Sequence, residues 1–273
     1  MTVADNSGTV GAEQGELIIV GTGYRAIGDL TLQAQSYIRA ADRVLHLLSD
    51  PLCADHIARL NPNAESLMRF YERGKPRHES YQEMSARILD EVQKGRLVCA
   101  VFYGHPGVFV APSHLAIKQA KAAGLRARML PAVSAEDWIF ADLGIDPGRE
   151  GCHCFEASDF LLHSRIHDPT SLLILWQVGV IGMIDWSPEF NPRPGAQVLV
   201  EVMTRSYSSE HEVIIYEASP YEVCQPRIER LPLVELPEIK LTACSTLVVP
   251  PATRRRVDLD MAKRIGFALP EPQ

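Results

Sequence analysis

The chain has 273 residues, of which 46% are hydrophobic and 22% are charged, and its formal net charge is −7. This length and composition indicate a globular protein with one large or two ordinary domains and exclude a largely disordered chain. The acidic balance argues against a nucleic-acid partner, and no apolar run approaches the roughly 20 residues of a membrane span. Because the first residues also lack a secretion signal, we expect a cytoplasmic enzyme with no membrane partner.

The first half of the chain alternates predicted strands and helices. Residues 1–14 are small and polar, and we expect them to form a disordered tail. After them, continuous apolar runs predict strands over 16–20, 43–48 and 97–102, and helical spacing predicts helices over 30–41, 81–94 and 114–123. Strands that are apolar throughout, rather than at alternate positions, predict a largely parallel sheet that is covered on both faces.

The pattern changes after Pro131. A helix is predicted over 134–143, with Ser134 as its N-cap and two carboxylates in its first turn. The apolar, β-branched segments that follow predict strands over 153–157, 171–178, 197–202, 212–217 and 245–249. We therefore predict an α/β protein with two α/β domains, residues 15–132 and 133–251, followed by a C-terminal tail over 252–273.

Six cysteines are present, and the sequence Cys152-His153-Cys154 contains residue types that bind metal ions. Ligands this close along the chain chelate poorly, and no second Cys/His pair completes a set of four. We predict no metal site and no disulfide framework, and we expect reduced, mostly buried thiols.

A glycine turn, Gly21-Thr22-Gly23, follows the first predicted strand, with Ala26 in the last place of a dinucleotide-binding pattern. That pattern also needs an acidic residue at the end of the next strand, but Asp42 comes before this strand and Asp50 comes late after it. A turn that merely closes a strand is an equally good interpretation, and the alternative is a dehydrogenase that binds NAD.

The loop over 103–109 directly follows a buried strand, where parallel sheets bind their ligands. Its two glycines permit a close backbone approach, and Tyr103 and Phe109 could flank a flat or cationic ligand. The alternative is a plain connection between a strand and a helix.

Phenols and guanidiniums are concentrated over 69–81. Arg77 and Tyr81 are four residues apart, so they are neighbours on one face of a helix. A guanidinium beside a phenol favours the phenolate and lowers the phenol's pKa, which would suit a general base. The alternative is an exposed, charged helix start.

Gln177 and Tyr216 each end an apolar predicted strand. They could be core polar groups with satisfied hydrogen bonds, or they could point into a cleft between the two domains.

Taken in order, several segments resemble the tetrapyrrole (corrin/porphyrin) methylase superfamily of S-adenosylmethionine (SAM)-dependent enzymes. Within it, the chain is most similar to the borosin peptide backbone α-N-methyltransferases. The resemblance rests on RFYERGKPRHESYQEM (69–84), YGHPGVF (103–109), SAEDWIFADLGIDPG (134–148), FEASDF (155–160), LLILWQVG (172–179), HEVIIYEA (211–218), RIERLPL (227–233) and STLVVPP (245–251).

The resemblance implies two α/β domains of the tetrapyrrole-methylase type with the SAM cleft between them. It also implies iterative methyl transfer from SAM to backbone amides of a ribosomally made peptide, with S-adenosylhomocysteine as product. It assigns catalysis to Tyr71, Arg77 and Tyr81, with Tyr81 as base or proton relay, Arg77 stabilising charge and Tyr71 orienting the amide. It places around SAM the residues Tyr103, His105, Val108, Phe109, Ser134, Ala135, Gln177, Tyr216 and Thr246.

The chain departs from the family pattern in two places. Met68 stands where some relatives carry a further tyrosine, so it cannot share the proton transfer. Ala26 replaces a glycine that is frequent in the superfamily, and we therefore do not assign that turn to SAM.

By comparison with fused relatives, residues 252–273 are too few to hold a clasp and a substrate peptide. The chain therefore resembles the split type, which implies a separate precursor with a helical binding domain and a homodimer in a 2:2 complex. The alternatives are a C-methyltransferase acting on a tetrapyrrole or another small molecule, and a non-catalytic module that binds SAM or a protein.

Overall fold

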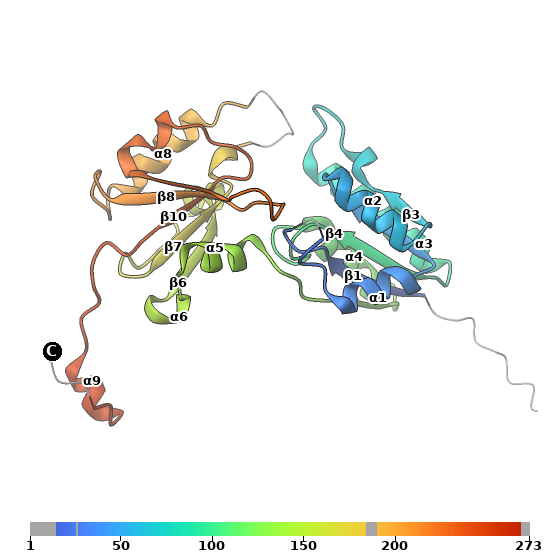
Figure 1. The fold of residues 1–273 in the computed structure, drawn as a ribbon, viewed down its shortest axis with the longest axis horizontal. Helices are drawn as coiled ribbons and strands as arrows, with labels where there is room; N and C mark the ends of the chain where they lie inside the picture. Colours follow the sequence, from blue (N-terminus) through green and yellow to red (C-terminus); the bar gives the residue numbers. More distant parts are fainter. Residues whose placement is uncertain (1–14, 26, 184–189, 269–273) are drawn as a thin grey trace, which may run out of the picture. The chain divides into compact units, whose positions relative to one another are not determined.

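The computed structural model describes residues 15–25, 27–183 and 190–268. These residues belong to two compact units (Figure 1). The first unit comprises Met1–Ile145, Met183–Phe190 and Ala218–Arg227, and the second comprises Asp146–Gly182, Asn191–Glu217 and Ile228–Gln273. The predicted tail over 1–14 and the position of Ala26 lie outside the described residues. The predicted boundary near residue 132 differs from this division, which groups the next helix with the first unit.

The first unit contains a five-stranded sheet in the order β3-β2-β4-β1-β5, in which all neighbouring strands run parallel. The strands are β1 (Glu16–Gly21), β2 (Arg43–Leu47), β3 (Ala64–Ser66), β4 (Leu97–Phe102) and β5 (Arg126–Met129). The helices are α1 (Leu32–Ala40), α2 (Pro51–Leu60), α3 (Arg77–Gln93), α4 (Ala111–Ala122) and α5 (Ala135–Leu143), with a 3-10 turn η1 (Met68–Phe70). The predicted parallel sheet is confirmed.

Helices cover both faces of this sheet, which explains the continuous apolar runs of its central strands β1 and β4. Leu17 and Ile19 of β1 pack in one cluster with α3 and α4. Ile18 and Val20 of the same strand pack in the other cluster with α1 and α2. Successive side chains of a strand point to opposite faces, so a continuous apolar run buries both of them.

The segment Ala218–Arg227 also belongs to the first unit. Its Tyr221 hydroxyl donates a hydrogen bond to the carboxylate of Asp50, which is the N-cap of α2. Glu222 lies 3.5 Å from the guanidinium of Arg25. The Asp50 hydrogen bond raises the pKa of Tyr221 and lowers that of Asp50, as expected when the phenol holds the proton.

The second unit contains a mixed sheet in the order β6-β7-β10-β8-β9. β6 and β7 are parallel, whereas β10 is antiparallel to both β7 and β8. The strands are β6 (Cys152–Glu156), β7 (Leu172–Trp176), β8 (Glu212–Glu217), β9 (Arg227–Pro232) and β10 (Thr246–Val249). Around them are α6 (Pro147–Glu150), α7 (Ala157–Leu162), α8 (Arg193–Met203), α9 (Leu259–Arg264), η2 (Val178–Val180) and η3 (Leu233–Glu238).

The strand predicted over 197–202 is wrong, because these residues lie in α8. The buried residues of that helix are Ala196, Leu199 and Met203, which are three and four positions apart. This spacing places them on one face of a helix, where they join the core of the second unit. The β-branched valines between them favoured a strand locally, and burial of the helical face outweighed that preference.

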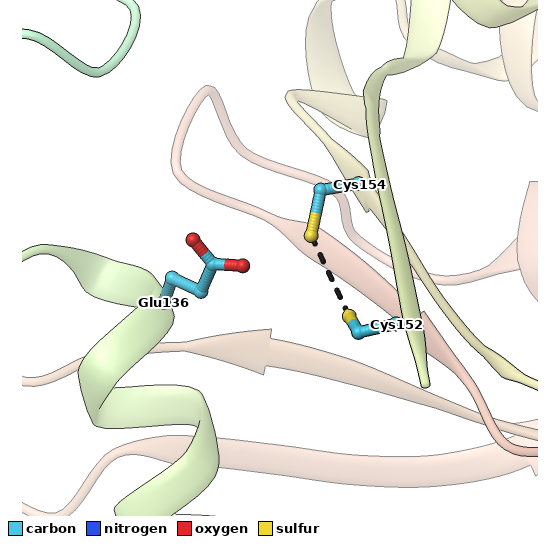
Figure 2. A group of neighbouring side chains, drawn as sticks. All are labelled: Glu136, Cys152 and Cys154. Carbon is cyan, nitrogen blue, oxygen red and sulfur yellow. Dashed lines mark hydrogen bonds between the residues drawn. The ribbon is translucent and has the colours of Figure 1, made fainter. Parts of the chain in front are cut away.

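The six thiols are less buried than predicted. Cys53 and Cys99 are buried, but Cys152 is half-buried and Cys154, Cys224 and Cys244 are exposed. On β6, the Sγ atoms of Cys152 and Cys154 are 3.6 Å apart, since residues two apart on a strand share a face (Figure 2).

Among the described residues, no helix is long and apolar enough to cross a membrane.

An ionic cluster joins α3 to the edge of the first sheet. Glu91 of α3 has a side chain only 4% exposed, and Arg87 lies 2.6 Å from its carboxylate. Arg96 and Lys94 also contact Glu91, while Arg87 bonds Glu65 of β3 at 2.6 Å. Burial acts to raise the pKa of Glu91, but hydrogen bonds from Arg87, Arg96 and Lys94 outweigh it and lower the pKa from 4.5 to about 2.

We predict that Glu91→Gln destabilises the protein by roughly 2 kcal/mol near neutral pH, because three cations then lose a buried partner. The folded carboxyl has the lower pKa, so its stabilisation is present above pH 4.5 and is lost as the pH falls toward 2. The difference between wild type and variant, measured by urea unfolding, should therefore shrink over that range. Asp55→Asn is the matched control, because the Arg59–Asp55 pair is exposed and its loss should change stability by less than about 0.5 kcal/mol. An equal effect of both substitutions would contradict the prediction.

Candidate active site

The loop over 103–109 lies against the glycine turn that follows β1. The backbone N–H of Gly104 donates to the carbonyl of Gly23 at 2.9 Å, and the N–H of Gly23 donates back to Gly104 at 3.3 Å. A Cβ atom at Gly21 would collide with the carbonyl oxygen of Gly104. The backbone contact between the ends of two parallel strands thus explains Gly21, whereas Gly23 is required by its φ of 77° and by the close approach of Asp29.

Hydrogen bonds within the loop fix its shape. The N–H of Gly107 donates to Nδ1 of His105 at 3.0 Å. The buried hydroxyl of Ser113, at the start of α4, donates to the carbonyls of Pro106 and Val110. His105, predicted to bind the cofactor, therefore holds the loop through one of its ring nitrogens.

The same loop presents large apolar side chains to solvent. Tyr103 is 54% exposed and Phe109 is 50% exposed, with Val108 between them also exposed. Phe109 has a φ of 55°, a left-handed conformation that disfavours side chains and is found at ligand sites. A folded core gains little from three such residues, whereas a flat or cationic ligand could pack on them.

The three residues predicted to be catalytic lie together in the first unit. Tyr71 directly follows η1, Arg77 is the first residue of α3, and Tyr81 lies one turn later. The rings of Tyr71 and Tyr81 meet edge to face, with centroids 6.3 Å apart. The guanidinium Nη2 of Arg77 is 3.3 Å from Sδ of Met183.

Ser80 explains how the two phenols are brought together, and the sequence analysis missed it. Its buried hydroxyl donates to the carbonyl of Phe70 at 2.9 Å, which ties the residue before Tyr71 to the residue before Tyr81. A serine in the first turn of a helix is common, so only its place beside Tyr81 could have drawn attention to it.

Tyr71 holds its proton strongly. Burial raises the pKa of its phenol, and the Tyr81 phenol, which shares a hydrogen bond with it, raises the pKa further. Tyr103 acts in the same direction, and Arg77 only partly opposes these effects. Tyr71 is therefore suited to donate a hydrogen bond and is unsuited to act as a base.

Tyr103 thus belongs near the catalytic residues as well as among the predicted cofactor residues. The two cofactor candidates of this unit that lie outside the loop are Ser134, the N-cap of α5, and Ala135, its first residue. Ser134 caps the helix, because its hydroxyl accepts from the N–H of Asp137 and the Asp137 carboxylate accepts from the N–H of Ser134 at 2.6 Å. This capping box confirms the predicted helix start.

The second unit holds the remaining cofactor candidates, and they lie at one end of its sheet. Thr246 of β10 is the register partner of Tyr216 of β8. Gln177 follows β7, the other neighbour of β10, and the N–H of Val178 donates to the carbonyl of Ser245 at 3.1 Å. Gln177 has a φ of 62°, so two of the three non-glycine residues with positive φ among the described residues are predicted cofactor residues.

A cavity of about 330 Å³ in the second unit is lined by residues 191–193 and 237–241, and none of the predicted site residues line it.

Comparison with known families gives one extended match. A profile of the Tetrapyrrole (Corrin/Porphyrin) Methylases matches residues 16–218. Among solved structures, the chain is similar to uroporphyrin-III C-methyltransferase from Thermus thermophilus, with a TM-score of 0.63 and 17% identity over 94% of this chain and 99% of that one. The same enzyme complexed with S-adenosylhomocysteine gives a TM-score of 0.58 and 17% identity, over 86% of this chain and 92% of that one. The predicted two-domain α/β fold is confirmed by this likeness.

The chain is also similar to methyltransferases that are joined to cyclic peptide precursors. The methyltransferase and cyclic peptide omphalotin A precursor of Omphalotus olearius is 44% identical over 92% of this chain and 61% of its own length. The dendrothelin A counterpart of Dendrothele bispora is 41% identical over 93% of this chain and 62% of its own length. A type III borosin precursor of Anomoporia bombycina is 42% identical over 94% of this chain and 30% of its own length. The chain thus spans about three fifths of the length of the first two relatives.

We predict that Tyr71 stays protonated through pH 10, the ordinary pKa of a tyrosine, because burial and the neighbouring phenols disfavour its phenolate. The measurement is the ¹³Cζ NMR shift of labelled tyrosines as a function of pH, with the Tyr71 signal assigned by its absence from Tyr71→Phe. A Tyr71 signal that titrates with a midpoint at or below 10 would contradict the prediction.

Proposed function

The chain belongs to the Tetrapyrrole (Corrin/Porphyrin) Methylase family, and from this premise we propose that it methylates backbone amide nitrogens of a peptide with SAM as methyl donor. The observation that carries the proposal is the paired phenols of Tyr71 and Tyr81 beside Arg77, near Tyr103 at the carboxyl end of β4. Relatives with 41–44% identity are named as methyltransferases joined to ribosomally synthesised cyclic peptide precursors, which favours a peptide substrate over a porphyrin.

Peptide N-methylation is difficult because the amide lone pair is delocalised into the carbonyl group. The enzyme must take the N–H proton while it holds the nitrogen in line with the methyl group. We propose that the Tyr81 oxygen accepts the amide N–H proton. Tyr71, which keeps its own proton, donates a hydrogen bond to that oxygen and so orients it. Arg77 adds a positive charge that stabilises the phenolate or the amide oxygen as negative charge develops there.

The residues of the first unit suit SAM. The exposed rings of Tyr103 and Phe109 could pack against an adenine or a sulfonium cation. At Gly104, no heavy atom of the described residues outside its chain neighbours lies within 4 Å of where a Cβ would stand, which leaves space for a bound group. When bound, SAM supplies an electrophilic methyl group. His105, Val108, Ser134 and Ala135 in this unit, and Gln177, Tyr216 and Thr246 in the other, are the further residues that we propose to bind it.

We propose that the peptide is presented by a separate precursor protein with a helical binding domain, and that the enzyme acts as a homodimer in a 2:2 complex. Support for a partner comes from apolar side chains around α9, where Leu259, Met261, Ile265 and Phe267 are all exposed. Exposed apolar residues grouped on one segment are typical of an interaction surface.

We predict that incubation with SAM adds the mass of one or more methylene groups to a precursor of the relatives' type, and that fragmentation places them on backbone nitrogens. Tyr81→Phe should lower the rate on the order of a hundredfold or more, because the proton acceptor is lost. Arg77→Ala should also be impaired, and intact and tandem mass spectrometry measures both.

Arg73→Ala is the matched control, because Arg73 is an exposed cation of the same segment and lies outside the proposed set. Tyr81→Phe with full activity would remove Tyr81 from the mechanism. A wild type that binds SAM but leaves every peptide unchanged would favour a small-molecule C-methyltransferase, and one that binds SAM without any turnover would favour a binding module.

We predict that Gly104→Ala weakens SAM binding at least tenfold in calorimetry, since the new methyl group occupies the open space in the loop. The backbone strain of a side chain at positive φ costs about 1 kcal/mol and must be separated from this effect. Gly124→Ala introduces the same strain at a φ of +74° with open space around it, away from the site. Equal SAM affinity of the two variants would contradict the prediction.

A further inference from the structure

A partly buried polar cluster lies next to the three cofactor candidates of the second unit. The carboxylate of Glu217 accepts hydrogen bonds from the hydroxyl of Thr242 at 2.9 Å and from the hydroxyl of Ser245 at 2.5 Å. Ser245 is fully buried, and its Oγ also accepts from the N–H of Thr242 at 2.8 Å. The side chains of Glu217, Thr242 and Ser245 form one network, which we call the Glu217 cluster.

Each connection of the Glu217 cluster leads to a predicted SAM residue. Glu217 is the chain neighbour of Tyr216, and Ser245 is the chain neighbour of Thr246. The carbonyl of Ser245 accepts from the N–H of Val178, which follows Gln177. The cluster therefore joins the ends of β7 and β8 to the start of β10, where Tyr216 and Thr246 pair in the sheet and Gln177 directly follows β7.

The backbone around the cluster is also closely packed. Gly179 lies against the backbone of Thr242, where a Cβ atom would collide with the Thr242 carbonyl oxygen. The N–H of Ser245 donates to that same carbonyl at 3.0 Å. Gln177, two residues before Gly179, is held in its left-handed conformation next to this contact. Such strain persists only where the surroundings fix the backbone.

A partly buried carboxylate lowers the stability of the fold unless it accepts hydrogen bonds, and an apolar residue in place of Glu217 would stabilise the core of this unit as well. A network that satisfies a charge, however, fixes the relative positions of the strands that supply its members. We infer that the Glu217 cluster positions Gln177, Tyr216 and Thr246 for binding SAM. This inference rests on the proposed function and assigns Glu217, Thr242 and Ser245 a positioning role without contact with the cofactor.

The test measures the affinity for SAM of Glu217→Gln and Thr242→Val by calorimetry, together with the midpoint of thermal unfolding. Thr242→Val keeps the shape of the side chain but removes the hydroxyl, whereas Thr242→Ser keeps the hydroxyl. We expect Thr242→Val and Glu217→Gln to raise the Kd about tenfold, and Thr242→Ser to stay within about twofold of wild type. Thr242→Val removes one hydrogen bond to the carboxylate, and Glu217→Gln removes the negative charge that strengthens both hydrogen bonds.

Asp168→Asn is the matched control in the same unit. Its carboxylate also accepts from a threonine and a serine hydroxyl, those of Thr170 at 2.8 Å and Ser171 at 3.5 Å, but it precedes β7 and so lies at the opposite end of that strand. The inference is overturned if folded Glu217→Gln and Thr242→Val bind SAM as wild type does. It is also overturned if Thr242→Ser loses as much affinity as Thr242→Val, or if Asp168→Asn has the same effect as Glu217→Gln. A wild type that binds no SAM would overturn the proposed function and this inference together, whereas wild-type binding with unaffected variants would overturn the inference alone.

Discussion

The contact between two backbones, at the turn after β1 and the loop after β4, is the constraint on which the site in the first unit depends. Parallel strands end at the same edge of a sheet, and here two chain segments meet there closely enough to exchange hydrogen bonds between Gly23 and Gly104. A side chain is excluded at Gly21, where a Cβ would collide with the carbonyl oxygen of Gly104. Tyr103 and Phe109 of the same loop are exposed, and Tyr103 lies near enough to Tyr71 to affect its pKa.

In this unit, burial and neighbouring side chains act together on the pKa values of Glu91 and Tyr71. Glu91 is buried but receives hydrogen bonds from three cations, so its charged form is favoured. Tyr71 is also shielded from solvent, yet its nearest polar neighbours are other phenols, and its neutral form is favoured. The single arginine beside Tyr71 does not reverse this. Burial and neighbouring groups therefore favour the charged carboxylate at Glu91 and the neutral phenol at Tyr71.

Much of the fold could be predicted from the sequence because burial on both faces leaves a strong local signal. The runs over 17–20 and 97–102 are apolar at every position, the pattern expected of a parallel strand that is covered on both faces. The signal failed for α8, where Val198, Val200 and Val202 suggested a strand while Ala196, Leu199 and Met203 formed the buried face. The proposed catalytic residues were predicted from the resemblance and from the four-residue spacing of Arg77 and Tyr81. Ser80 and the Glu217 cluster could not be found, because their hydrogen bonds join residues whose proximity exists only after folding.

The division of the chain has a further consequence. The first unit is completed by Ala218–Arg227, which reaches it only after most of the second unit has been traversed, and Tyr221 and Glu222 then contact Asp50 and Arg25. A gene fragment that ended near residue 145 would encode all five strands of the first sheet but would lack these contacts. Recombination at that point would not transfer the first unit intact. The two units would therefore have to be inherited together as a single module.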